Sequence, residues 1–406
     1  MKKLAGNPYL KVKEGKIFID LVPLECLLRD YNTPLIIFIE NRIKDNIKRF
    51  NNVFSNIFNN YQGFYSVKAN YLPQINKLIS TEKIGAELIS LPELVMTLNA
   101  DYSSENIIVG GPYLSNELIK NCMNHLIKEI VVYNLTDLKL IDNYAKKFNI
   151  CQDVCLRINS MKYESKLGIK INSENSKTIK HILDQCNNIR ISTILSHYGS
   201  QMNHPNQYLN NAKLLINALK ILKNNGIPIK NINFGGGFPE ATVMPEEQLQ
   251  IIGNRIKKNL EKNQIEYENV YFEPGRYIVG DAAVFIAKII KKTKDRWVIL
   301  NIGNHICPKF ARCSLRFYNA SRIEKAHKYK TSIAGIIPTD QDVLAKDYFF
   351  TNQIHIKDNV LITNVGAYCL TFSNRFPYRL PKILLIKDDG YREIFNQKED
   401  GDFSIY

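Results

Sequence analysis

The chain has 406 residues, of which 45% are hydrophobic and 23% are charged. This composition excludes the disordered and fibrous classes, because it supplies enough apolar side chains for a sizeable buried core. The 54 Lys and Arg residues outnumber the 39 Asp and Glu residues and give a formal net charge of +15. The basic residues are spread along the chain without a dense run. We therefore interpret the charge as a solvated surface and predict no nucleic-acid partner.

The cysteines and the apolar segments indicate the cellular location of the protein. Eight cysteines are present, with no CxxC pair and no spacing typical of zinc ligands. A chain of this length does not need disulfides, so we predict reduced thiols, no metal site and a cytoplasmic location. No apolar run follows the charged start, and the longest apolar stretch, roughly residues 277–290, is too short to cross a bilayer. We predict a protein without membrane contact.

Short β-branched runs alternate with helical segments between residues 63 and 279. The predicted strands are 63–69, 84–90, 107–111, 129–134, 153–159, 191–200, 231–237 and 270–279. The predicted helices include 40–54, 91–99, 116–126, 137–148 and 205–225. Eight strand–helix units predict a (β/α)8 barrel, whereas a doubly wound open sheet would not need eight.

The pattern changes after residue 280. Strand-like runs at 283–291, 296–302, 331–337, 359–364 and 382–387 have turn residues between them and no strong amphipathic helix. Similar runs lie at 9–12 and 16–19, before the barrel begins. We predict an α/β barrel domain of residues 33–280 and an all-β domain of residues 8–32 plus 281–406, which takes in the N-terminal strands.

Each predicted barrel strand ends in polar residues or glycine. A charged residue there either faces the mouth of the barrel, where the chemistry of such folds lies, or is costly to bury. A single strand of this kind would mean little, but eight that share one end predict a site. In chain order these residues are Lys68, Glu87, Ser90, Gly110, Gly111, Asn134, Arg157, Asn159, His197, Gly199, Ser200, Gly235, Gly236, Gly237, Glu273, Gly275 and Arg276.

The side chains in this set supply complementary chemistry. Lys68 lies among apolar residues, which would lower its pKa and make it a nucleophile, although a lysine that reaches solvent is an equal reading. The glycines at 235–237 offer backbone amides to an anion, or simply form a turn. Glu273 and Arg276 could hold a ring nitrogen and a phosphate, or only pair with each other. His197 could stack on a ring or lie in the core. Together they are the groups that a pyridoxal phosphate enzyme requires.

Six segments carry a resemblance to a known family. They read SVKAN at 66–70, GAELISLPEL at 85–94, HYGSQ at 197–201, GGGFP at 235–239, EPGR at 273–276 and GAY at 366–368. In this order they resemble the fold-type III pyridoxal phosphate enzymes, specifically the diaminopimelate/ornithine/arginine decarboxylase family. The resemblance covers nearly the whole chain and implies an alanine racemase-like barrel followed by a β domain.

The resemblance implies a role for each matching residue. Lys68 would form the Schiff base with pyridoxal 5'-phosphate, His197 would stack on its ring and Glu273 would pair with the ring nitrogen. The remaining cofactor contacts would be Glu87, Gly199, Ser200, Gly235, Gly236, Gly237, Gly275, Arg276 and Tyr368. Contacts to a small amino-acid substrate would come from Arg276, Thr339, Asp340, Asp342 and Tyr368. The activity would be decarboxylation, in a homodimer whose subunits share each active site.

Departures from the family pattern concern the substrate. Pro338 stands where the family has a catalytic cysteine, and Pro has no proton to give. Thr339 replaces a glutamate of the diaminopimelate enzymes, and residues 303–310 lack their arginine-proline pair. These features resemble the branch that decarboxylates amino-acid conjugates. Two alternatives remain: other pyridoxal phosphate chemistry such as racemisation, and a non-catalytic regulatory protein.

Overall fold

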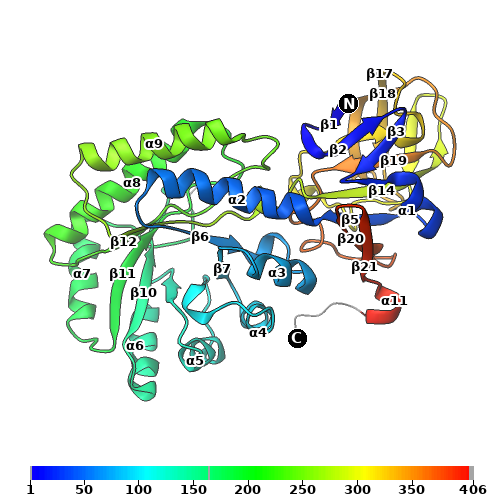
Figure 1. Cartoon of the computed structure of the whole chain (residues 1–406). Coiled ribbons are helices and arrows are strands. Elements are labelled where there is room, and N and C mark those ends of the chain that lie inside the picture. Colours follow the sequence, from blue (N-terminus) through cyan, green and yellow to red (C-terminus); the bar gives the residue numbers. More distant parts are fainter. Residues whose placement is uncertain (1, 163–164, 402–406) are drawn as a thin grey trace.

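Eight parallel strands close into a barrel in the middle of the chain, on the left of Figure 1. In this computed structural model, which describes residues 2–162 and 165–401, β13 pairs with β6 and completes the ring. The strands are β6 (Tyr61–Ser66), β7 (Gly85–Leu88), β8 (Ile107–Gly110), β9 (Glu129–Val132), β10 (Gln152–Arg157), β11 (Ile189–Leu195), β12 (Asn231–Asn233) and β13 (Asn269–Phe272). The predicted (β/α)8 barrel is confirmed.

Amphipathic helices cover the outside of the barrel. They are α2 (Glu40–Ile57), α3 (Pro73–Ser80), α4 (Leu91–Asn99), α5 (Asn116–Asn124), α6 (Thr136–Phe148), α7 (Ser173–Leu183), α8 (Pro205–Asn224) and α9 (Glu246–Lys262). The short α10 (Arg276–Val279), whose four residues are all buried, follows β13. Helix α4 shows why one of them starts where it does. The Ser90 hydroxyl accepts from the Glu93 amide at 3.4 Å, and the Glu93 carboxylate accepts from the Ile89 amide at 2.7 Å. This reciprocal cap satisfies amides that the first turn leaves without helical partners.

Short 3-10 turns and two small helices complete the helical structure. The turns are η1 (Val67–Ala69), η2 (Ser104–Asn106), η3 (Lys309–Ala311) and η4 (Ala320–Arg322), and the helices are α1 (Leu24–Asp30) and α11 (Gln397–Asp400). No helix in the described part of the chain is long and apolar enough to cross a membrane.

Two sheets form the β-rich part of the molecule, on the right of Figure 1. The four-stranded sheet holds β1 (Lys2–Leu4), β2 (Asn7–Lys13), β3 (Lys16–Ile19) and β4 (Val22–Pro23). The nine-stranded sheet holds β5 (Leu35–Ile39), β14 (Ala283–Lys292), β15 (Trp297–Leu300), β16 (Arg316–Asn319), β17 (His327–Ala334), β18 (Val343–Thr351), β19 (Asn359–Thr363), β20 (Lys382–Lys387) and β21 (Gly390–Phe395). The N-terminal strands thus form a sheet of their own, which packs on the larger one through a shared apolar cluster.

Strand β5 corrects the predicted domain boundary. It pairs with β14 on one side and with β20 on the other, and all five of its residues are buried. Residues 35–39, which we counted with the barrel, therefore lie in the nine-stranded sheet. Their partners are about 250 and 350 residues away in sequence, so no local pattern marks the pairing.

A buried ion pair ties the barrel to the link that leads into the β domain. Arg42, in the first turns of α2, donates to both carboxylate oxygens of Asp281, at 2.7 and 3.2 Å. Asp281 lies between α10 and β14 and also accepts from the Asn46 side chain at 2.8 Å and from the Thr242 amide at 2.9 Å. The side chains of the pair are 2% and 0% exposed. The start of α2 is thereby fixed to the junction of the two parts.

Candidate active site

Lys68 lies one turn beyond the end of a barrel strand. The chain leaves β6 at Ser66 and enters the 3-10 turn η1, which carries the lysine. Three hydrogen bonds join this turn to a β-domain segment at residues 366–371. They run from the Tyr368 amide to the Ala69 carbonyl (2.7 Å), from the Asn70 side chain to the Gly366 carbonyl (2.9 Å) and from the Thr371 hydroxyl to the Lys68 carbonyl (3.0 Å). The β domain thus fixes the backbone that presents the lysine.

The Lys68 amine is paired with a carboxylate. Its Nζ lies 2.6 Å from Glu87 Oε2, an oxygen that also accepts from the Ser66 hydroxyl. Burial alone would lower the pKa of Lys68, but the charge of Glu87, followed by Tyr368 and Glu273, raises that pKa above its ordinary value. The sequence-based prediction of a lowered pKa is therefore wrong, because the wall around the lysine carries two acids. Burial would raise the pKa of Glu87, but the charge of the Lys68 ammonium outweighs this effect and lowers that pKa below its ordinary value.

Glu273 is a second acid at the same end of the barrel. It follows β13, is 6% exposed, and accepts from the Asn233 side chain at 2.8 Å. Burial, followed by the nearby charge of Glu87, raises the pKa of Glu273 to about 7. A carboxyl group in this state can share a proton with a basic ring nitrogen at neutral pH.

His197 presents a neutral ring to the same space. The Gly236 amide donates to its Nδ1 at 3.4 Å and so orients the imidazole. Burial, followed by the positive charges of Arg157 and Lys68, lowers the pKa of His197 to about 3. An uncharged flat ring is suited to stacking on another ring.

A cavity of about 320 Å³ lies between Lys68, Glu273 and His197. Its walls are Ser66, Lys68, His197, Ser200, Gln201, Gly237, Phe238, Glu273, Gly275, Arg276, Phe310, Ala311, Arg312, Tyr368 and Phe372. At one side Arg276 is held by the Ala311 carbonyl at 2.6 Å and by Glu240 at 3.2 Å. This guanidinium, the Ser200 hydroxyl and the glycine backbone form a donor set suited to a phosphate.

The glycines of the site leave room that a side chain would fill. Gly237 has a φ of +90°, and a Cβ there would lie 2.2 Å from the Gly199 carbonyl oxygen. A Cβ on Gly236 would lie 2.3 Å from the Glu273 carbonyl oxygen, and one on Gly235, whose φ is +65°, would lie 2.9 Å from the Ser196 carbonyl oxygen. The loops after three strands therefore approach each other only because these positions lack a side chain. Together with the lysine, the acids and the neutral imidazole, this cradle fits pyridoxal phosphate.

The structure places only some of the predicted substrate residues at the cavity. Arg276 and Tyr368 line the cavity, with the guanidinium 4.9 Å from the centre of the tyrosine ring. Thr339 and Asp340 are exposed, next to Pro338, in the loop at residues 335–342, which does not line this cavity. Asp342 is buried, and its two oxygens accept from the Asn304 and Ile337 amides at 2.7 Å each. We therefore assign Asp342 a structural role, which is to hold this loop, and not the predicted contact with substrate.

Several residues in or near the site were not assigned a role from the sequence. Arg157 was noted only at a strand end; its guanidinium lies 4.6 Å from the Tyr133 ring centre and donates to the Tyr133 hydroxyl at 2.6 Å. Its charge also acts on Glu273, whose pKa it lowers against the effect of burial. Phe310, Arg312 and Phe372 come from β-domain segments, and no sequence signal placed them here.

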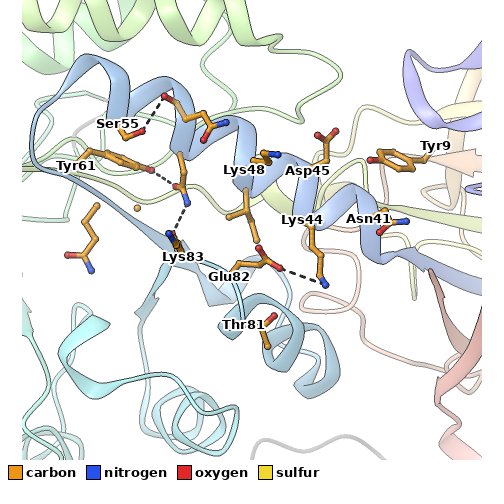
Figure 2. Close-up of a pocket in the computed structure, with 15 residues that line it drawn as sticks. Tyr9, Asn41, Lys44, Asp45, Lys48, Ser55, Tyr61, Thr81, Glu82 and Lys83 are labelled. Carbon is orange, nitrogen blue, oxygen red and sulfur yellow. Dashed lines mark hydrogen bonds and ion pairs between the residues drawn. The ribbon is translucent and has the colours of Figure 1, made fainter. Parts of the chain in front are cut away.

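A larger cavity, of about 810 Å³, lies elsewhere on the barrel, beside α2 (Figure 2). It borders the first residues of β6, whereas Lys68 follows the last. Figure 2 shows that its polar groups already bind one another: Tyr61 donates to Asn51 at 2.9 Å, Asn51 to the Lys83 carbonyl at 2.7 Å, and Lys44 pairs with Glu82 at 3.8 Å. Because barrel chemistry lies at the carboxyl ends of the strands, the smaller cavity is the candidate active site.

A (β/α)8 barrel that presents a lysine, two carboxylates, an imidazole and a phosphate cradle at its mouth defines a class, the barrel enzymes that use pyridoxal phosphate. Residues 40–280 match the family model described as "Pyridoxal-dependent decarboxylase, pyridoxal binding domain". The chain belongs to this family. It is a carboxy-lyase that acts on an amino acid or an amino-acid conjugate.

Individual relatives agree with the family over nearly the full length. The chain is 25% identical to diaminopimelate decarboxylase of Staphylococcus aureus, over 95% of this chain and 96% of that protein. It is also 25% identical to the L-glutamyl-[BtrI acyl-carrier protein] decarboxylase of Niallia circulans, over 95% of each. The structure of diaminopimelate decarboxylase from M. jannaschii with L-lysine superposes with a TM-score of 0.87 at 23% identity, over 96% of this chain and 95% of that one. This structural likeness shows the shared fold.

Proposed function

We propose that the chain decarboxylates its substrate with pyridoxal 5'-phosphate attached to Lys68. The observation that carries this proposal is one cavity that brings together the Lys68 amine, the Glu273 carboxylate, the His197 ring and the Arg276 guanidinium, with Glu87 paired to the lysine. When bound, the cofactor supplies an electron sink for the charge that remains on the α carbon after carbon dioxide leaves.

The residues of the chain divide the work of holding and orienting that group. Glu273, whose pKa is about 7, would hold the proton of the ring nitrogen, and the neutral His197 imidazole would stack on the ring. Arg276, Ser200 and the backbone at Gly237 and Gly275 bind the phosphate. Glu87 holds the lysine amine in the cavity at 2.6 Å. The absence of side chains leaves room for the cofactor at Gly199, Gly235 and Gly236. Tyr368 forms the cavity wall next to Arg276.

We propose an amino acid or an amino-acid conjugate with a second polar centre as substrate. The named relatives support this range, since one group acts on diaminopimelate and another on a glutamyl carrier-protein conjugate. Pro338 cannot donate the proton that replaces the lost carboxylate. Two groups of this chain that face the cavity and can hold such a proton are the Lys68 amine and the Tyr368 hydroxyl.

We propose that two copies of the chain share each site. The tip of the loop at residues 335–342, with Thr339 and Asp340, is exposed and does not line the cavity of its own chain. At the mouth of that cavity Phe310 and Phe372 are 72% and 41% exposed. A loop from a partner subunit would cover these rings and bring Thr339 and Asp340 to the substrate. All eight cysteines are unpaired, which supports the expected reducing, cytoplasmic location.

Reductive labelling tests the cofactor assignment. The protein is loaded with pyridoxal phosphate, reduced with borohydride and mapped by peptide mass, and release of carbon dioxide is followed with a panel of diamino, dicarboxylic and glutamyl-conjugated amino acids. We expect the pyridoxyl group on Lys68, and neither label nor turnover in Lys68→Ala. Lys44→Arg, in the larger cavity, is the matched control and should retain both. A label on another lysine contradicts the assignment.

Mixing two inactive variants tests the shared site. Lys68→Ala removes the cofactor attachment, and Asp340→Ala changes the loop that we place in the partner's site. Random reassociation of the two should restore about a quarter of wild-type activity, because half of the dimers then contain one intact site. A protein that light scattering shows to be monomeric while it turns over substrate contradicts the proposal.

A further inference from the structure

Two cysteines adjoin the candidate active site without a role in decarboxylation. Cys313 and Cys369 are 56 residues apart in sequence, yet their sulfur atoms lie 3.5 Å apart. Cys313 precedes β16 and is half-buried, whereas Cys369 directly follows Tyr368 and is 1% exposed. Both are free thiols.

The surroundings distinguish the two sulfurs. Arg276 Nη1 donates to Cys313 Sγ at 4.0 Å. The hydrogen bond from Cys369 and the charge of Arg276 lower the pKa of Cys313, against the opposing effect of burial. Hydrogen bonds with Cys307 and Cys313, together with burial, raise the pKa of Cys369. Cys313 is thus the thiol of the pair that loses its proton more readily, and Cys369 the one that holds it more tightly.

The pair touches the groups that we assign to the cofactor phosphate. Arg276, which donates to Cys313, also lies 4.9 Å from the centre of the Tyr368 ring. Arg312 and Tyr368, the chain neighbours of the two cysteines, line the cavity. The Tyr368 amide in turn donates to the Ala69 carbonyl, next to Lys68. A movement of either sulfur would therefore also shift residues that line the cavity.

We propose that Cys313 and Cys369 are a peroxide-oxidised dithiol whose disulfide reversibly weakens the hold of the site on its cofactor. This effect on the site rests on the proposed function, but formation of the bond does not. The Cys313 thiolate attacks hydrogen peroxide, takes one oxygen as a sulfenic acid, and the other oxygen leaves as water after protonation. The Cys369 thiol then attacks the Cys313 sulfur, the disulfide forms, and a second water leaves. Two thiols thus lose two electrons and two protons to one peroxide, which becomes two waters.

The disulfide changes the site in two ways. A disulfide sulfur cannot ionise, so Cys313 no longer offers the Arg276 guanidinium an acceptor that can carry a negative charge. The sulfurs must also move from 3.5 Å to covalent distance, which draws residues 311–313 and 367–369 together. Ala311 holds Arg276 through its carbonyl, so the guanidinium is displaced from the position in which we place the phosphate.

Peroxide treatment of the reduced holoenzyme tests the proposal. We expect peptide mapping to show a Cys313–Cys369 disulfide. At limiting pyridoxal phosphate we expect about a tenfold lower rate of decarboxylation, as for loss of one hydrogen bond to a charged group. Dithiothreitol should restore the rate. Cys369→Ala should show no disulfide, no reversible loss, and sulfenic acid at Cys313 that a dimedone probe captures. Cys313→Ser should show neither disulfide nor captured sulfenic acid.

The exposed Cys151 provides the matched control, since Cys151→Ser should leave both the disulfide and the loss of rate unchanged. A disulfide between Cys307 and Cys369, or no disulfide while the enzyme is active, overturns the proposal. A Cys313–Cys369 disulfide that leaves the rate unchanged overturns the link to the cofactor site. If the reduced protein releases no carbon dioxide but the disulfide forms, the proposed function fails and the dithiol remains.

Discussion

Lys68, in the turn that follows β6, meets Glu87, a residue of the neighbouring barrel strand β7, at 2.6 Å. The pairing fixes the amine in the cavity and at the same time favours its charged form, which cannot attack an aldehyde. The amine therefore has to give up its proton before it can attach the cofactor. Glu87 is the residue that sets how readily this happens.

Glu87→Gln should move cofactor attachment to lower pH. The Glu87 charge raises the pKa of Lys68, so removing that charge lowers the pKa and leaves more free amine at neutral pH. The rate at which the apo protein takes up pyridoxal phosphate, followed by visible absorbance across a pH series, should show its midpoint at least about one pH unit lower. Ser66→Ala removes a donor to Glu87 but keeps the charge, so its profile should stay near that of the wild type. An unchanged midpoint in Glu87→Gln contradicts the assigned pairing.

Glu273→Gln should damage turnover far more than cofactor binding. Glutamine can still accept from the Asn233 side chain but carries no negative charge to keep a proton on the ring nitrogen. Loss of one preorganised electrostatic contact commonly costs on the order of 10²–10³ in kcat. Carbon dioxide release should fall by about that factor, while borohydride labelling of Lys68 persists. A variant with near wild-type kcat would remove Glu273 from the proposed chemistry.

The sequence predicted the site residues that follow barrel strands, but it did not predict most of those that the β domain contributes. Lys68, His197 and Glu273 each follow a barrel strand, and parallel strands in a barrel deliver their carboxyl ends to one mouth. Phe310 and Phe372 lie far from these strands in sequence and reach the cavity only through packing of the β domain. The pKa of Lys68 was misjudged for a related reason, because the charge that controls it is 19 residues away.

The fold shows the same division between local and distant information. Helix α4 was predicted with its observed bounds because its cap and its apolar face lie within a few residues of each other. Strand β18 was missed because most of its residues are exposed or half-buried and do not alternate in the way that marks a strand. Strand β5 was placed in the wrong domain because its neighbours, β14 and β20, are distant in sequence.

Arg42→Met should destabilise the protein strongly. The change leaves the Asp281 carboxylate, which is 0% exposed, without its cation at the junction of the barrel and the β domain. Breaking a buried pair in this way typically costs about 3–5 kcal/mol. Guanidinium unfolding should show a loss of this size, and Arg42→Met combined with Asp281→Asn should recover part of it. Lys16→Met, in an exposed pair with Glu25, is the control and should change stability by less than about 1 kcal/mol.

Glu129→Gln should make the protein more stable at alkaline pH. Glu129 begins β9 and is 2% exposed; its Oε1 accepts from the Ser192 and Thr193 hydroxyls, and its Oε2 has no partner within the described residues. Burial raises the pKa of this carboxyl, although the two hydroxyls partly oppose the shift. The folded protein therefore binds the Glu129 proton more tightly than the unfolded chain does, and stability falls as pH rises from the ordinary glutamate pKa through the raised one.

Glutamine has the shape of the protonated glutamate and needs no proton, so it removes this dependence. At about pH 8 the free energy of unfolding of Glu129→Gln should exceed that of the wild type, and the difference should shrink toward about pH 4.5, where both chains carry a neutral group. Urea unfolding at the two pH values measures the change. Glu268→Gln, an exposed carboxylate paired with Lys230, should show little difference at either pH. An equal loss of stability at both pH values in Glu129→Gln would mean that the Ser192 and Thr193 hydrogen bonds, and not the buried charge, determine the contribution of this residue.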